Sequence, residues 1–273
     1  MRILVKIGGA QLQAPAARRK LCGAIAHARQ QGNEILVVHG GGNQIRRVGA
    51  RLGLVDHYHE GLRITDADTA EVALMVLGGL VNRTLVHTLQ TCGVPAVGLT
   101  GADGATFSAL RQRRDGVDLG FVGAVDDIDA RLVQTLLQSG HTPVLGTVAP
   151  GTHAADGEPF LNINADHAAG PLCRAFACDA LLFLTDVPAV LDGDGRPLPL
   201  LTAADCARLV AAGVATGGMQ PKLEAALLAA RENPRAIVKI AAADADDCVL
   251  AALKDGVGSR FFGSRNPEAV QHG

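Results

Sequence analysis

Two lysines, one aspartate and several glycine-rich turns are the residues of this chain whose types and spacing could do chemistry. Lys6 precedes a glycine pair, and three further glycines follow the apolar run that ends at His39. Asp166 comes mid-chain, and Lys222 comes late, shortly after another glycine pair. Phosphoryl transfer needs cations and backbone N–H donors around developing negative charge more than it needs a nucleophile. The sequence therefore indicates phosphoryl transfer.

The glycine clusters after the first two apolar runs are candidate anion sites. Glycine lets the backbone approach an anion closely, and it leaves N–H groups free where a helix begins. A tight turn without a ligand would use the same residues. Neither cluster has the Gly-Lys-Ser/Thr of a P-loop, and neither fits G-x-G-x-x-G. The two commonest nucleotide-binding signatures are therefore excluded.

Lys222 is expected in the first turn of a helix, with Pro221 at the first helical position. The helix dipole disfavours a cation there. Lys222 is therefore either a solvated surface residue or, with the helix N-terminus, part of an anion site; the glycines before it favour the anion site. Asn164 and Asp166 leave a similar choice open, because either could simply cap the helix that follows.

Other chemistries and partners find little support in the sequence. His57 and His59 lack a third ligand, so we expect no zinc site, and no G-x-S-x-G marks a serine nucleophile. The six cysteines contain no C-x-x-C and are expected to be reduced thiols in the cytoplasm. A net charge of -2 without a basic block argues against nucleic acid. We also expect no signal peptide and no apolar run of membrane-spanning length.

Strands and helices are predicted to alternate along the chain. Apolar residues make up 48% of the chain and its mean hydropathy is +0.21, as in a folded protein with a large core. Continuous apolar strands separated by helices indicate a mostly parallel sheet in a three-layer αβα sandwich. Strands are predicted at 2–7, 34–39, 94–99, 143–148, 180–185 and 236–240, a hairpin at 111–125, and helices at 15–31, 40–52, 67–91, 128–138, 165–176, 203–212, 221–231 and 244–253.

Ligands of such sheets collect at the carboxyl ends of the strands. The segments 6–9 and 39–42 fall there in the predicted arrangement, and so do Thr185 and Asp186. We therefore expect these segments to line one site.

Six segments, taken in order, resemble the amino-acid kinase family, and within it most closely the kinases that act on N-acetylglutamate. The resemblance implies transfer of phosphate from ATP, with Mg²⁺, to the γ-carboxylate of N-acetyl-L-glutamate in arginine synthesis. It also implies an N-lobe at 1–168 for the acyl substrate and dimerisation, and a C-lobe at 169–273 for ATP. The six segments are Lys6-Ile7-Gly8-Gly9, Val38-His39-Gly40-Gly41-Gly42, Gly61-Leu62-Arg63-Ile64-Thr65-Asp66, Asn162-Ile163-Asn164-Ala165-Asp166, Leu184-Thr185-Asp186-Val187 and Gly217-Gly218-Met219-Gln220-Pro221-Lys222.

The resemblance also implies the role of each site residue, and the chemistry agrees. A carboxylate acceptor is already ionised at neutral pH, so it needs no general base, and the difficulty is one anion attacking another. Mg²⁺ is expected on the phosphates of ATP and on water, without a protein cage. The implied residues are Lys6, Asp166 and Lys222 for catalysis, Gly41, Gly42, Arg63 and Asn162 for the acyl substrate, and Gly8, Gly9, Thr185, Asp186, Gly217 and Gly218 for the nucleotide.

Several alternatives stay open at this point. N-acetyl-aminoadipate, or a carrier-bound substrate, differs from N-acetylglutamate by as little as one methylene, which a pocket distinguishes by only ~1–3 kcal/mol. A carbamate or uridylate kinase would lack the acceptor-side residues. A non-catalytic amino-acid sensor could keep the fold, although retention of the lysines and the aspartate argues against it. Departures from the family pattern stand at Asn43, Ala189 and 241–244.

Assembly is predicted from one helix and from the start of the chain. Arginine-sensitive N-acetylglutamate kinases resemble one another in an extra N-terminal helix that links dimers into a hexameric ring. Here the first predicted strand begins at Arg2, so we expect a homodimer that arginine does not inhibit in that way. The helix predicted at 67–91, which contains Gly78 and Gly79, is the expected contact, unless it is merely buried in its own subunit.

Overall fold

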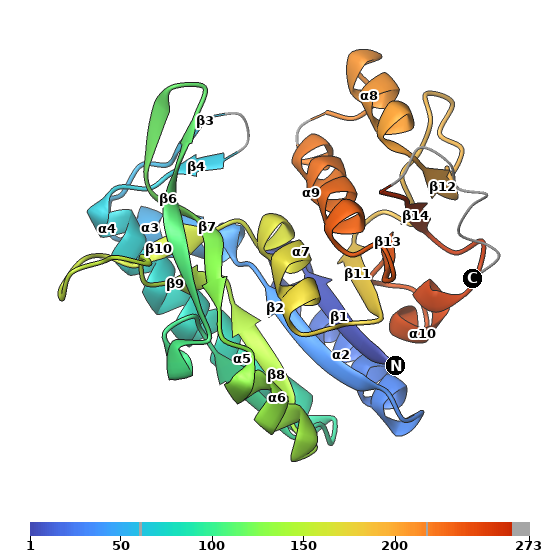
Figure 1. Ribbon diagram of the computed structural model, residues 1–273, viewed down its shortest axis with the longest axis horizontal. Helices are drawn as coiled ribbons and strands as arrows, with labels where there is room; N and C mark the ends of the chain where they lie inside the picture. The colour runs from blue at the N-terminus through green and yellow to red at the C-terminus, as the bar shows by residue number, and fades with distance from the viewer. Residues whose placement is uncertain (60–61, 217, 264–273) are drawn as a thin grey trace.

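A mostly parallel sheet forms the centre of the protein (Figure 1). The computed structural model describes residues 1–59, 62–216 and 218–263, and within them eight strands form this sheet. Among the pairs of neighbouring strands in this sheet, only the pair β13 and β14 is antiparallel. In spatial order the strands are β12 (Leu200–Leu201), β14 (Ser259–Phe261), β13 (Ile237–Ala242), β11 (Ala180–Thr185), β1 (Arg2–Ile7), β2 (Glu34–His39), β8 (Thr142–Gly146) and β5 (Ala96–Leu99).

Helices cover both faces of this sheet, because successive residues of each buried strand face opposite layers. In β1, Ile3 and Val5 pack into one apolar cluster and Leu4 packs into the other. The predicted three-layer αβα sandwich is thereby confirmed. The first layer holds α1 (Gly9–Gln13), α2 (Pro15–Gln30), α3 (Gly42–Arg51), α4 (Ala67–Leu74), η1 (Met75–Val81), α5 (Asn82–Thr91) and α10 (Cys248–Leu253). The second holds α6 (Arg131–Gln138), α7 (Ala165–Ala175), α8 (Ala203–Ala211) and α9 (Met219–Glu232).

The long helix predicted at 67–91 is present, with a π-helical segment in its middle. The segments α4, η1 and α5 follow one another without a break. By length and composition alone this helix could cross a membrane, which corrects the expectation that no apolar run is long enough. However, 56% of its most apolar window is buried inside the protein, as in the core helix of a globular fold.

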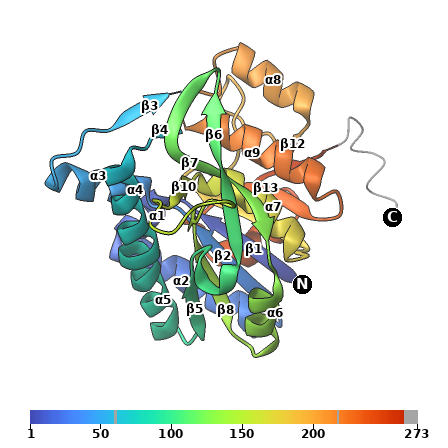
Figure 2. The same ribbon diagram turned by 60° about the vertical axis from the view of Figure 1, so that its left-hand side comes forward.

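A smaller sheet packs on the side of the second layer, because its buried residues Phe107, Ala109 and Ile163 belong to the same apolar cluster as α6 and α7 (Figure 2). Its strands are β6 (Phe107–Arg114), β7 (Val117–Ile128), β10 (Leu161–Ile163) and β9 (Val148–Ala149), and the short helix η2 (Asp103–Ala105) precedes them. The hairpin predicted at 111–125 is confirmed as β6 and β7 and is longer than expected. A second hairpin pairs β3 (His57–His59) with β4 (Leu62–Ile64).

Some elements differ from the sequence-based expectations. The short strands β3, β4, β9, β10, β12 and β14 were not predicted, because two or three residues carry no periodic signal. The helix expected from Pro221 begins at Met219, so Pro221 is its third residue. Proline is tolerated there because N–H groups of the first turn have no partner within the helix. The last helix begins at Cys248 instead of 244. The expected lobe boundary between residues 168 and 169 falls within α7.

Candidate active site

One cavity of about 640 Å³ lies at the carboxyl ends of three adjacent strands, β11, β1 and β2. This is where the loops of a parallel sheet leave room for a ligand. The cavity brings together every predicted site residue within the described part of the chain, and Gly217 lies outside that part. The predicted residues in its lining are Lys6, Gly8, Gly9, Gly41, Gly42, Arg63, Asn162, Asp166, Thr185, Asp186, Gly218 and Lys222.

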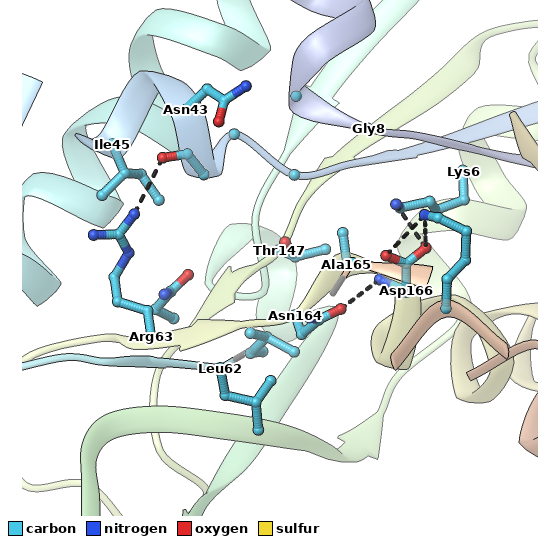
Figure 3. Close-up of a pocket in the computed structure, with 18 of the residues that line it drawn as sticks. Lys6, Gly8, Asn43, Ile45, Leu62, Arg63, Thr147, Asn164, Ala165 and Asp166 are labelled. Atoms are coloured by element: carbon cyan, nitrogen blue, oxygen red, sulfur yellow. Dashed lines mark hydrogen bonds and ion pairs between the residues drawn. The ribbon is translucent and has the colours of Figure 1, made fainter. Parts of the chain in front are cut away.

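Two lysines from different elements meet one carboxylate at one end of the cavity (Figure 3). Lys6 Nζ lies 2.7 Å from Asp166 Oδ1, and Lys222 Nζ lies 3.3 Å from the same oxygen. Lys6 comes from β1, Asp166 from the first turn of α7, and Lys222 from the first turns of α9. With all three groups ionised, two positive charges share one negative charge, so the cluster attracts an anion.

The ionisation of this cluster follows from burial and from its charges. Burial raises the pKa of the Asp166 carboxyl, but the charges of Lys6 and Lys222 outweigh burial and hold that pKa at about 2. Burial lowers the pKa of the Lys6 ammonium, and the nearby Asp166 opposes that effect. Asp166 therefore stays ionised at neutral pH and holds the lysine ammonium groups in place.

Asn164 leaves Asp166 free for this task by capping α7 itself. The Asn164 side-chain oxygen accepts hydrogen bonds from the backbone N–H groups of Asp166, at 2.9 Å, and His167, at 3.4 Å. The capping interpretation is thus confirmed for Asn164 and wrong for Asp166, whose carboxylate contacts the lysines instead. Asn162 lies on β10, between β7 and β9, and lines the cavity.

The two glycine loops lie close to each other in the lining of the cavity. A Cβ added to Gly9 would lie 3.1 Å from the Cα of Gly41 and 2.9 Å from the side-chain oxygen of Gln44. The Gln44 amide donates a hydrogen bond of 2.9 Å to the Gly9 carbonyl oxygen. A side chain at Gly9 would crowd both neighbours, so glycine favours this close approach, in which backbone from two strands lines the cavity.

Arg63 lies in the same cavity, well apart from the lysines and Asp166 (Figure 3). It belongs to β4, its side chain pairs with Asp56, and its Nη2 donates a hydrogen bond of 3.2 Å to the Gly42 carbonyl oxygen. Its guanidinium also lies 5.0 Å from the centre of the Tyr58 ring. The cavity therefore has positively charged groups in two separate places, with the glycine loops also in its lining.

Thr185 is the last residue of β11, which pairs with β1, and Asp186 follows it. The Thr185 hydroxyl donates a hydrogen bond of 2.9 Å to Asp186 Oδ1. Gly218 precedes α9 and also lines the cavity. A second cavity, of about 610 Å³, continues the same edge of the sheet, where Pro188 and Ala189 follow β11 and Ala241 and Ala242 end β13.

Sequence reasoning missed several residues in the first cavity. Gln11, Tyr58 and Thr147 line it, but none belongs to one of the six segments that marked the site in the sequence. Sequence reasoning also missed Asn82, whose polar side chain in the middle of an apolar helix was an available signal. No group of three or more His, Cys, Asp and Glu side chains among residues 1–59, 62–216 and 218–263 could hold a metal ion.

Comparisons with known proteins agree with this geometry. Residues 1–239 match the amino acid kinase family. An acetylglutamate kinase of Koribacter versatilis is 42% identical over 82% of this chain and 84% of its own length, and one of Acidobacterium capsulatum is 40% identical over 94% and 98%. The crystal structure of smu.665 from Streptococcus mutans superposes with a TM-score of 0.80 at 26% identity, covering 96% of this chain and 99% of that one. The chain belongs to the amino acid kinase family.

Proposed function

We propose that this protein is an acetylglutamate kinase, which transfers the γ-phosphoryl group of ATP to the γ-carboxylate of N-acetyl-L-glutamate in arginine biosynthesis. The observation that carries the proposal is the convergence of Lys6 and Lys222 on Asp166 in a cavity that also contains Arg63. Relatives about 40% identical over most of the chain carry the same name. We place the reaction in the cytoplasm, as expected for reduced thiols.

The proposed step needs charge neutralisation and no proton transfer. An oxygen of the γ-carboxylate attacks the γ-phosphorus, a new O–P bond forms, and the bond to the bridging oxygen of ADP breaks. Lys6 and Lys222 would neutralise the charge that spreads over the transferring group, and Asp166 would keep both ammonium groups aimed at it. The N–H groups of the glycine loops would add donors at fixed positions.

The acceptor would lie between the glycine loops and Arg63. Arg63 would pair with the α-carboxylate in a two-pronged contact that lysine does not reproduce. Gly41 and Gly42 would receive the γ-carboxylate, and Asn162 would hydrogen-bond the acetamido group. These contacts would place the acyl substrate in the N-lobe, residues 1–168.

The nucleotide would lie on the other side, over the C-lobe of residues 169–273. Its phosphates would contact Gly8, Gly9 and the start of α9 with Gly217 and Gly218, and Thr185 and Asp186 would lie beside them. The second cavity begins three residues after Thr185 and has apolar walls suited to a base. Ala189, Ala241 and Ala242, which depart from the family pattern, lie in those walls.

Magnesium fits this site as an ion coordinated by the phosphates of ATP. The described residues contain no carboxylate cage for a metal, and Mg²⁺ typically keeps phosphate and water ligands. Bound in that way, the ion would withdraw charge from the phosphates during transfer.

An ATP-turnover assay tests the proposal directly. Purified protein is incubated with Mg²⁺-ATP and N-acetyl-L-glutamate, N-acetyl-L-aminoadipate or no acceptor, and ADP release is measured. We expect turnover with N-acetyl-L-glutamate and a lower kcat/KM with the longer acceptor. A higher kcat/KM with N-acetyl-L-aminoadipate would reassign the substrate, and no turnover with either would favour the sensor.

We also propose that the protein forms a homodimer through the helix at 67–91. Met75 and Leu80 lie in its π-helical segment and are 50% and 46% exposed in the single chain. Light scattering should report a dimer that Leu80→Glu dissociates. Leu110→Glu is the matched control, because Leu110 is 48% exposed on β6. A wild-type monomer or hexamer would refute the assembly, and equal effects of both variants would refute the helix contact.

A further inference from the structure

Behind the second glycine loop lies a buried polar pair that the proposed reaction does not use directly. His39 is the last residue of β2 and Asn82 is the first residue of α5, and both are fully buried. Asn82 Nδ2 lies 3.0 Å from His39 Nε2, and His39 Nδ1 lies 3.1 Å from the Gly40 carbonyl oxygen. Most buried polar atoms have hydrogen-bond partners, and both ring nitrogens of His39 and the amide nitrogen of Asn82 have them here, whereas Asn82 Oδ1 has none among the described residues.

The partners of Asn82 decide which ring nitrogen of His39 carries the proton. Asn82 Nδ2 also lies 2.9 Å from the Val144 carbonyl oxygen, which can only accept a hydrogen bond. The contacting Asn82 atom is therefore the amide nitrogen, with one hydrogen for Val144 and one for His39. His39 Nε2 must then accept, so the proton of the neutral ring is on Nδ1. That N–H donates to the Gly40 carbonyl oxygen.

This hydrogen bond sets the direction of the next backbone N–H. Within a trans peptide, the carbonyl oxygen and the following N–H point in opposite directions, and the described chain has no cis peptide bonds. Since the Gly40 carbonyl is held toward the buried ring, the Gly41 N–H turns the other way. Gly40, Gly41 and Gly42 all line the cavity, whereas His39 lies behind them.

We infer that His39, oriented by Asn82, is a positioning residue that aims the Gly41 N–H at the carboxylate of the acceptor. The identity of that acceptor rests on the proposed function. The orientation of the peptide does not, because it follows from the hydrogen bonds of the pair alone.

The surrounding backbone is shaped to admit this pair. A Cβ on Gly98 would collide with the Asn82 amide. A Cβ on Gly146 would lie 2.8 Å from the Leu77 carbonyl oxygen and 3.4 Å from His39 Cε1. The π-helical segment η1 ends immediately before Asn82, and such segments frequently occur at functional sites. Two strand glycines and a helix distortion therefore converge on one buried contact.

Two substitutions of His39 separate positioning from mere packing. His39→Asn can place an amide N–H where Nδ1 stands, whereas His39→Gln places its amide near Nε2, beyond reach of the Gly40 carbonyl. Both variants remove the ring, so both should lose similar thermal stability. We expect His39→Gln to raise the KM for N-acetyl-L-glutamate about 10- to 100-fold, with the KM for ATP changed less than about threefold. His39→Asn should raise the acceptor KM less than about threefold.

Equal acceptor KM values in the two variants, or a defect confined to ATP, would overturn the inference. If neither variant folds, nitrogen-15 NMR of the wild-type ring decides. We expect a protonated Nδ1 and an unprotonated Nε2 at pH 7, and a protonated Nε2 would overturn the inference. If wild-type protein does not phosphorylate N-acetyl-L-glutamate, the proposed function fails. The inference about His39 is then tested by the NMR measurement alone, which must find the ring proton on Nδ1.

Discussion

Replacing Asp166 by asparagine would remove the carboxylate between two ammonium groups while keeping the shape of the side chain. Lys6 Nζ lies 2.7 Å and Lys222 Nζ 3.3 Å from the same oxygen of Asp166. The side chain of Lys6 is only 5% exposed, so water cannot replace the lost charge. Removing one partner of a buried ion pair costs about 3–5 kcal/mol. We expect Asp166→Asn to lower the free energy of unfolding by that amount at pH 7.

The depressed pKa of Asp166 also makes part of the wild-type stability depend on pH. That pKa is about 2 in the folded protein, against about 3.9 for an ordinary carboxyl in the unfolded chain. This difference corresponds to about 2–3 kcal/mol. Because the folded pKa is the lower one, the contribution is complete above the unfolded pKa and is lost as the pH falls toward about 2. The Asp166→Asn variant should lack this part of the acid-induced loss.

Urea unfolding of wild type and variant at several values from pH 7 down to about pH 3 measures both effects. Asp127→Asn is the control, because Asp127 is an exposed carboxylate on β7, and surface changes typically stay within about 0.5 kcal/mol. A loss below about 1 kcal/mol for Asp166→Asn at pH 7 would refute the reasoning, since the ion pair would then be worth no more than an exposed one. An unchanged dependence of its unfolding free energy on pH would refute the assigned pKa.

The other predictions concern the proposed reaction and the packing around it. Lys6→Ala or Lys222→Ala should lower kcat about 10²–10³-fold with an unchanged circular dichroism spectrum, because each removes a cation used chiefly in the transition state. More than about a tenth of wild-type turnover in either variant would show that its lysine has another role. Arg63→Lys should raise the KM for N-acetyl-L-glutamate and leave the KM for ATP unchanged, because it loses a bidentate contact on the acceptor. Steady-state kinetics that found an ATP-side defect instead would remove Arg63 from the acceptor site. Gly98→Ala should lower the thermal midpoint strongly because its Cβ would meet Asn82, whereas Gly23→Ala, at a position of α2 with open space around it, should not.

Much of the fold was predictable because the central strands are long and apolar. β1, β2, β8 and β11 are buried on both faces, so each appears in the sequence as a continuous apolar run of the expected length. The glycine and charged segments that follow them could be assigned to one edge of the sheet, since the strands run parallel. The short strands β3, β4, β9 and β10 could not be predicted, because their pairing depends on partners distant in the chain.

The candidate site was also predictable only in part from the sequence. The sequence by itself determined which residues could do the chemistry, because lysine, aspartate and glycine at strand ends and helix starts have few other uses in combination. Only the tertiary structure decided that Asn164 caps α7 while Asp166 contacts both lysines. Tertiary structure alone also brought Asn82 to His39, 43 residues away in the chain. Local patterns report the propensity of a segment, whereas a hydrogen bond between distant segments depends on how the whole sheet and its helices pack.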